Sequence, residues 1–181
     1  PETFILATYG TLRTLDPAAC YDTTGAQRIL NIYETLIFFD ASKTDAFVPV
    51  LATRVPTLEN GGISADGTTY TFTIRKGIEF HNGADLTPGD VAYSLKRNMI
   101  ADPDGGPMWM LLEAVTGKNS TRDENGKIRP GIFKMIDDAV SARGDRVIIR
   151  LPRPYPPLMG ILANSCAVVL NREWAMANGA W

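Results

Sequence analysis

The chain has 181 residues, 45% of them hydrophobic, which is enough for one or two small domains with a sizeable core. Its formal net charge of −2 argues against nucleic acid or an anionic membrane surface as a partner. No apolar run reaches the roughly 20 residues that span a bilayer, and two cysteines are too few for a disulfide scaffold. The chain begins without Met or a basic leader, so we expect any signal peptide to have been removed.

The N-terminal part is expected to form a strand, a loop and a helix. Thr3 to Tyr9 is a short, mostly apolar run, which predicts a buried strand that leads into a loop over residues 10–22. Thr24 with Gln27 three residues later fits a capping box. Apolar residues at helical spacing then extend the predicted helix to Ile37: Ala26, Ile29, Leu30, Tyr33, Leu36 and Ile37.

Residues 38–55 predict short strands and turns, and residues 66–97 predict a turn, a strand, a loop and a capped helix. Asp66-Gly67 supplies turn chemistry, and the next strand places Tyr70, Phe72 and Ile74 on one apolar face. In the helix that follows, the expected cap is Thr87, the first residue is Pro88, Asp90 completes the capping box, and one stripe holds Val91, Leu95 and Met99.

The second half alternates short elements with breakers. A helix is expected over 108–115, a solvated excursion over 117–131, and a hairpin with arms at 134–142 and 146–151. Expected after that are a helical turn at 158–162, an apolar strand at 166–170, and a last helix that Asn171 caps and Gly179 ends. This order predicts an α+β fold with mixed strand pairing.

Residues 66–97, which read DG-x-TYTF-x-IR-x-G-x-x-FH-x-G-x-x-LT-x-x-DV-x-YS-x-x-R, resemble the signature region of the family 5 bacterial extracellular solute-binding proteins. Proteins of this family deliver oligopeptides, dipeptides and some nickel chelates to ABC importers. The resemblance extends over nearly the whole chain, through the stretches Leu15–Ala18, Tyr33–Ile37, Gly105–Glu113 and Arg153–Ala163. Because such proteins are considerably longer, the chain resembles only their N-terminal portion.

The resemblance implies a periplasmic-binding-protein-like fold of the three-domain class II type, with an incomplete first lobe. It implies domain I over 1–37, domain II over 38–163 and a truncated return to domain I over 164–181. It also implies a peptide or other small solute as ligand, a membrane permease as partner, no cofactor, and a periplasmic or outer-surface location. Membrane association would come from a lipid anchor outside this chain.

The residues expected to contact ligand come from two places. In the family, the loop after the first strand offers backbone groups to an extended ligand, and every peptide repeats the same donors and acceptors. Domain II of similar proteins contributes an aromatic wall, where Met is adaptable and Trp supplies rigid area. The expected set is Tyr9, Gly10, Thr11, Leu12, Met108 and Trp109. The alternative for Met108 and Trp109 is that both pack in the core of a short helix.

Catalytic and metal chemistry find little support in the sequence. His81 is the only histidine, which argues against His-cluster metal sites, and we expect it to hydrogen-bond a turn. Asp137 and Asp138, if they enter a strand, point to opposite faces. The rival functions are a secreted hydrolase, with His81 or these carboxylates as its base, and an interaction module that binds protein through Met108 and Trp109.

Cys20 and Cys166 belong to the same domain in the implied topology, so an oxidising compartment would let them bond if they faced each other. However, Cys166 lies in an apolar stretch where a free cysteine packs as a small hydrophobe. We therefore expect two free thiols.

Overall fold

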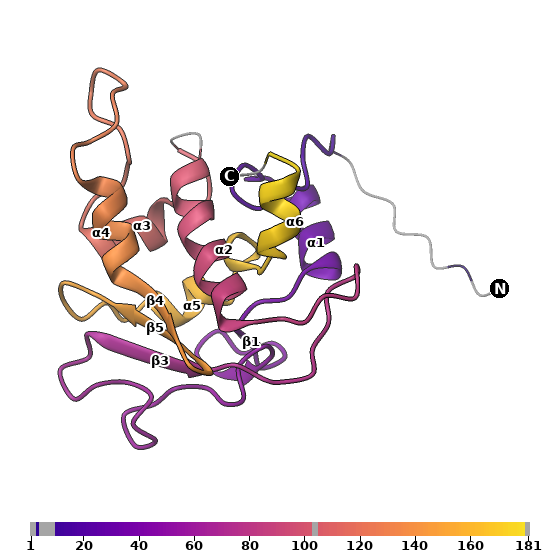
Figure 1. The fold of residues 1–181 in the computed structure, drawn as a ribbon, viewed down its shortest axis with the longest axis vertical. Coiled ribbons are helices and arrows are strands. Elements are labelled where there is room, and N and C mark those ends of the chain that lie inside the picture. The colour runs from indigo at the N-terminus through magenta and orange to yellow at the C-terminus, as the bar shows by residue number, and fades with distance from the viewer. Residues whose placement is uncertain (1–2, 4–9, 103–104, 180–181) are drawn as a thin grey trace.

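The computed structural model describes residue 3 and residues 10–102 and 105–179, and its α+β class agrees with the prediction from sequence (Figure 1). The predicted strand at residues 3–9 lies almost wholly outside the described residues. In chain order the elements are α1 (Thr23–Ile32), β1 (Ile37–Phe39), β2 (Phe47–Pro49), β3 (Thr69–Thr73), α2 (Pro88–Ala101), α3 (Trp109–Thr116), α4 (Ile132–Ala139), β4 (Val140–Arg143), β5 (Arg146–Arg150), α5 (Leu158–Leu162), the 3-10 turn η1 (Ser165–Ala167) and α6 (Arg172–Ala177).

The strands form two small sheets. One has the order β3-β5-β4, and the other pairs β1 with β2. In the larger sheet Tyr70 lies opposite Ile149 and Phe72 opposite Val147, and all four side chains are buried. Every pairing between the described strands is antiparallel, so the mixed pairing expected from the element order is not found among them.

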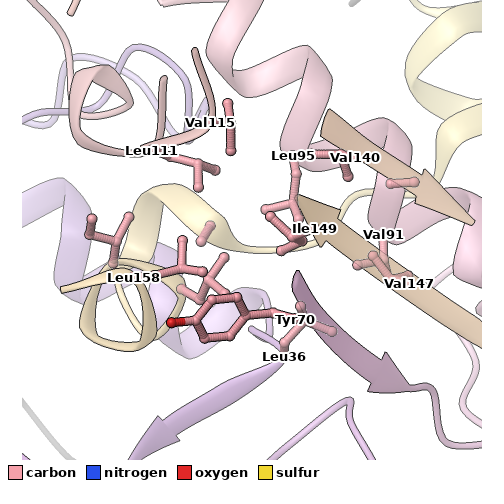
Figure 2. Packing of buried hydrophobic residues seen from close by; sticks show 14 of the residues in the cluster. Leu36, Tyr70, Val91, Leu95, Leu111, Val115, Val140, Val147, Ile149 and Leu158 are labelled. Atoms are coloured by element: carbon pink, nitrogen blue, oxygen red, sulfur yellow. The ribbon is translucent and has the colours of Figure 1, made fainter. Parts of the chain in front are cut away.

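Helix α2 lies over the larger sheet and occupies the middle of the molecule, with α3 and α4 on one side and α1 and α6 on the other (Figure 1). Its predicted stripe of Val91, Leu95 and Met99 is fully buried. Figure 2 shows Leu95 beside Val140 and Ile149 of the sheet. The core is therefore centred between one face of α2 and one face of the sheet, and α3, α4 and α5 add further buried residues to it.

The predicted caps of α2 and α6 are confirmed, and α3 lies one residue later than the predicted range 108–115. Thr87 and Asp90 form the capping box of α2, with Pro88 as its first residue. Helix α3 ends at Gly117, whose positive φ of 71° suits a residue without a side chain. Asn171 caps α6 by accepting a hydrogen bond from the Trp174 amide at 2.7 Å.

The predicted limits of the first helix were wrong. Asp22, not Thr24, caps α1, because the Asp22 carboxylate accepts from the Gly25 amide at 2.7 Å. The helix ends at Ile32, and Tyr33 is extended with φ −118° and ψ 161°. Ile37 therefore belongs to β1, and its buried side chain continues the apolar pattern from a strand.

The predicted hairpin arm at residues 134–142 was also partly wrong. Residues 132–139 form α4, and only residues 140–143 enter the sheet as β4. Ile132, Ile136 and Ala139 are buried, and their spacing of four and three residues matches one face of a helix. A short apolar pattern of this length suits either element, and packing against the core selects the helix.

The predicted strand at residues 166–170 does not form. Residues 165–167 make the turn η1, and residues 168–170, which begin with Val168 in an extended conformation, belong to no strand. The Val169 amide donates to the Glu34 carbonyl at 3.0 Å, whereas the Leu170 amide donates to the Ser94 hydroxyl at 2.8 Å. Backbone groups that a ladder would use are thus partly satisfied by a side chain of α2.

Candidate functional site

The N-terminal loop (residues 10–22) has a defined shape in the part that precedes α1. The Asp16 carboxylate accepts from the Ala18 amide at 3.0 Å, and the Asp16 carbonyl accepts from the Cys20 amide at 2.9 Å. Cys20 is buried against the first turn of α1, because a Cβ added to Gly25 would lie 2.1 Å from the Cys20 sulfur. Residues 16–20 are therefore a closed turn that rests on the helix.

Arg97 of α2 binds the Asp16 carboxylate with both terminal nitrogens of its guanidinium. Nη1 donates to Oδ1, and Nη2 donates to Oδ2 at 2.6 Å. Burial raises the pKa of the Asp16 carboxyl, but the hydrogen bonds from Arg97 and Ala18 outweigh it, so the pKa lies below its usual value. The same hydrogen bond raises the pKa of Arg97. This pair joins the N-terminal loop to the central helix.

A second face of α2 carries buried polar side chains at four-residue spacing, which we call the polar seam: Asp90, Ser94 and Asn98. These side chains bond to the backbone of the return segment (residues 164–172). Asn98 donates to the Cys166 carbonyl at 2.9 Å, and Asp90 accepts from the Arg172 amide at 2.9 Å. Sequence reasoning missed the seam, although three polar residues at helical spacing are a visible signal.

Tyr21 and Trp109 form an exposed aromatic contact between the end of the N-terminal loop and the start of α3. The Trp109 indole nitrogen donates to the Tyr21 hydroxyl at 3.4 Å. Tyr21 is 61% exposed, and Trp109 is partly buried. Sequence reasoning expected Trp109 here but did not identify Tyr21, which lies three residues after the LDPA stretch (Leu15–Ala18).

Gly10 lies at the same N-terminal end of α1. A Cβ added there would come within 2.6 Å of the Thr24 hydroxyl, and the φ of 144° is one that side chains disfavour. Thr11 and Leu12 are exposed beside it. Tyr9 lies outside the described residues. The structure therefore gathers Gly10 to Leu12, Tyr21 and Trp109 around the start of α1.

Met108 is placed differently from Trp109. Its side chain is fully buried in the main hydrophobic cluster. For Met108, the alternative that it packs in the core therefore fits the structure better than ligand contact. The Met108 amide donates to the Asp102 carboxylate at 2.8 Å, and the Gly106 amide donates to the other oxygen at 2.8 Å. Met108 thus supports the position of Trp109 and offers no exposed surface of its own.

A hollow of about 570 Å³ lies at the opposite end of α1, between residues 30–34, the loop 78–82 and the start of α6. His81 is exposed at its edge. His81 was expected to hydrogen-bond its turn. In this turn the side-chain acceptor is Asn82, which accepts a hydrogen bond from the Ala84 amide at 3.2 Å. The sequence did not point to this hollow.

The candidate catalytic groups are not brought together. Asp137 pairs with Lys96, which lowers the Asp137 pKa, whereas Asp138 pairs with Lys134 one helical turn away. Both carboxylates lie on α4, so the expectation that they enter a strand was wrong. Among the described residues, no three His, Cys, Asp or Glu side chains are grouped to hold a metal ion.

Both cysteines are free and buried in this structure. Burial raises the pKa of Cys166 to about 12, and burial also raises the pKa of Cys20. Neither thiol is therefore ionised at neutral pH.

In the described part of the chain, no helix combines the length and the apolar character that crossing a bilayer requires.

Residues 46–180 match the family described as bacterial extracellular solute-binding proteins, family 5 (Middle). The glutathione-binding protein GsiB of Pectobacterium atrosepticum is 27% identical over 167 residues, which are 92% of this chain and 27% of that protein. The dipeptide-binding protein DppE of Bacillus subtilis is 27% identical over 169 residues, which are 93% of this chain and 28% of that protein. The chain thus spans little more than a quarter of these relatives.

Solved structures give the same picture of the fold. The pheromone receptor PrgZ superposes with a TM-score of 0.71 at 22% identity, over 93% of this chain and 30% of that chain. OppA of Listeria monocytogenes, solved with bound peptide, superposes with a TM-score of 0.69 at 22% identity, over 91% of this chain and 30% of that chain. The fold described above is therefore the fold of part of these proteins.

Proposed function

Because the chain belongs to the bacterial extracellular solute-binding proteins of family 5, we propose that it forms part of a receptor that captures peptides or peptide-like solutes. The receptor would pass its ligand to the membrane permease of an ABC importer. It would act by binding, without chemical conversion of the ligand, in the periplasm or at the outer cell surface. A lipid anchor outside this chain would hold it at the membrane.

The observation that carries this proposal is the grouping at the start of α1. Residues 10–12 are exposed, and the backbone groups of an exposed loop suit the repeating donors and acceptors of a peptide main chain. Tyr21 and Trp109 add an exposed aromatic surface with a polar edge, which suits side chains of varied shape. Together they favour a ligand that is extended, amide-rich and variable in sequence.

Two hydrophobic clusters support the proposed division into domain I (1–37 and 164–181) and domain II (38–163). The main cluster is formed chiefly by residues of the proposed domain II. The second joins Cys20 and Ile29 to Val168, with Leu15 and Tyr33 packed against it. All five residues of this cluster fall in the two segments assigned to domain I.

Capture would require closure around the ligand. Receptors of this kind shift from an open to a closed state, and only a ligand that contacts both lobes favours the closed state. The relatives named above are three to four times longer than this chain, so the second lobe is expected in the rest of the protein. Within this chain, ligand contacts are proposed only for residues 10–12, Tyr21 and Trp109.

The test is isothermal titration calorimetry on the full-length protein. Native mass spectrometry first identifies the ligand that the purified protein retains, and that ligand is then titrated into stripped protein. Trp109→Ala should weaken binding by about tenfold or more, roughly 1.4 kcal/mol, as expected for an aromatic anchor. The matched control is Trp174→Ala, because Trp174 is 57% exposed on α6. Equal affinities for both variants and the wild type would contradict the proposed site.

A further inference from the structure

We propose that the ion pair between Asp16 and Arg97 positions the ligand-contacting surface, so that Arg97 sets ligand affinity without touching the ligand. This inference rests on the proposed function, because it concerns the surface made by Tyr21 and Trp109. Arg97 is buried in the interior, with 6% of its side chain exposed, so it acts only through the residues that it holds. Asp16, with 37% exposed, lies where the interior meets the surface.

The Asp16 carboxylate fixes the loop on two sides. One side is Arg97, whose planar guanidinium binds both carboxylate oxygens and so fixes their direction as well as their position. The other side is the loop itself, because Asp16 also accepts from the Ala18 amide and, through its carbonyl, from the Cys20 amide. The turn over residues 16–20 therefore has the orientation that Arg97 imposes.

Tyr21 follows this turn directly and transmits its orientation to the surface. Asp22 immediately afterwards caps α1, so Tyr21 stands between two fixed points only a few residues apart. The Tyr21 hydroxyl accepts from Trp109 at 3.4 Å, which is a long hydrogen bond at an exposed site. That contact alone is too weak to place the ring, so we assign its placement to the turn that Arg97 holds.

Arg97 and Trp109 belong to neighbouring helices of the same module. Helices α2 and α3 contact each other, and Met108, which precedes Trp109, is buried in the cluster that includes Leu95 and Met99 of α2. The N-terminal loop is thus attached to this module at Arg97, and its aromatic residue meets the module again at Trp109. The position of the Tyr21 ring relative to the Trp109 ring is therefore set by the ion pair between Arg97 and Asp16.

The principal variant is Arg97→Lys, which retains the positive charge but loses the two-pronged geometry. We expect only a fraction of the folded Arg97→Lys molecules to place Tyr21 correctly. The apparent ligand affinity is the wild-type affinity multiplied by that fraction. A competent fraction of about one tenth would weaken ligand binding about tenfold. The matched control is Lys96→Met, because Lys96 is the preceding residue of α2 but pairs with Asp137 of α4.

Two readouts separate positioning from a loss of stability, both on the full-length protein. In protein labelled with 5-fluorotryptophan, the ¹⁹F resonance of Trp109, assigned with Trp109→Phe, should move or broaden in Arg97→Lys, while that of Trp174 stays in place. A double-mutant cycle of Arg97→Lys with Trp109→Ala should be non-additive, because both changes remove the same surface. If Arg97→Lys does not fold, Asp16→Asn on the more exposed partner tests the same points.

Each outcome has a distinct meaning. Binding that Trp109→Ala weakens and that both Arg97→Lys and Asp16→Asn leave unchanged overturns the role of the ion pair while the proposed site stands. If the affinity losses of Arg97→Lys and Trp109→Ala are additive, or if the Trp109 resonance does not move in Arg97→Lys, the ion pair only stabilises the fold. Either result overturns the proposal that it positions the ligand-contacting surface. A stripped protein that binds neither its retained ligand nor any peptide of a mixed library overturns the proposed function and this inference together.

Discussion

Arg97 and Asp16 lie 81 positions apart in the sequence and form a two-pronged ion pair, with Nη2 of Arg97 2.6 Å from Oδ2 of Asp16. The pair attaches the N-terminal loop to the helix around which the rest of the structure packs. Because Arg97 is buried, a change at Asp16 removes the two charge-assisted hydrogen bonds that this guanidinium makes to the carboxylate in the interior. The contact is therefore sensitive to pH and to substitution on either side.

The first prediction concerns acid stability. The folded pKa of Asp16 lies below its usual value of 3.8, so the carboxylate binds its proton less readily in the folded state. Its contribution to stability is fully present above that usual value and is lost as pH falls through the folded pKa. Urea midpoints of the full-length protein should therefore fall more steeply below about pH 4 in the wild type than in Asp16→Asn. Parallel curves would contradict a depressed pKa.

The second prediction concerns the start of α2. Thr87→Ala removes the side chain that accepts from the Asp90 amide and should lower stability by about 1 kcal/mol. Urea unfolding measures the loss, and hydrogen exchange should accelerate in the first turn of α2. Thr44→Ala, at an exposed turn position, is the control and should change neither. Ligand affinity should be the same for both variants, and a selective loss in Thr87→Ala would place this end of α2 in the site.

The third prediction concerns the polar seam. Asn98 is fully buried and donates to the Cys166 carbonyl, so Asn98→Ala leaves that carbonyl unsatisfied. We expect a loss of about 1–3 kcal/mol in the free energy of unfolding. Asn31→Ala is the matched control, because exposed Asn31 bonds only within its own helix, to the Gln27 carbonyl. Equal small effects at both positions would show that the return segment is held by apolar packing alone.

The fourth prediction concerns the thiols. Cys20 and Cys166 are 3% and 1% exposed, and the pKa of both is raised, so neither should react with a disulfide reagent at neutral pH in the native protein. Both should react once the unreduced protein is unfolded. If neither thiol reacts after unfolding, and no covalent dimer is present, the two cysteines form a disulfide in the natural compartment.

The elements with a complete local signal were predictable from sequence. Helix α2 has its cap, its first-turn proline and its apolar stripe within the same few residues, and the structure confirms each of them. Helix α6 was predictable for the same reason, from Asn171. The strand β3 alternates strictly, and its buried residues Tyr70 and Phe72 are the expected ones. The local sequence is therefore enough to identify these elements, although packing stabilises them.

The misassigned elements depend on contacts between distant residues. Residues 134–139 have a pattern that suits either a strand or a helix, and only packing of Ile132 and Ile136 against the core decides between them. The apolar stretch 166–170 was expected to form a strand, but three of its polar backbone groups bond to side chains of α2. The four-residue spacing of Ser94 and Asn98 is visible in the sequence, but it does not show that the two side chains are buried, because polar residues in a helix are usually exposed to solvent.

In the candidate site, sequence reasoning found only the residue whose own side chain suggests ligand contact, which is Trp109. Trp109 is a large aromatic residue at a helix start, and the structure leaves it partly exposed, whereas its neighbour Met108 is buried. Tyr21 becomes relevant through its contact with Trp109, 88 positions away. Such a pairing is a property of the fold and cannot be inferred from local spacing.

The polar seam also determines which substitutions positions 170 and 172 of the return segment tolerate. Ser94 and Asp90 bond to the amides of residues 170 and 172, not to their side chains. Almost any amino acid can therefore replace Leu170 or Arg172 without loss of these hydrogen bonds. The side chains at both positions are thus free to vary. The exception is proline, which has no amide hydrogen to donate. Homologous proteins should vary widely at these two positions yet exclude proline from both.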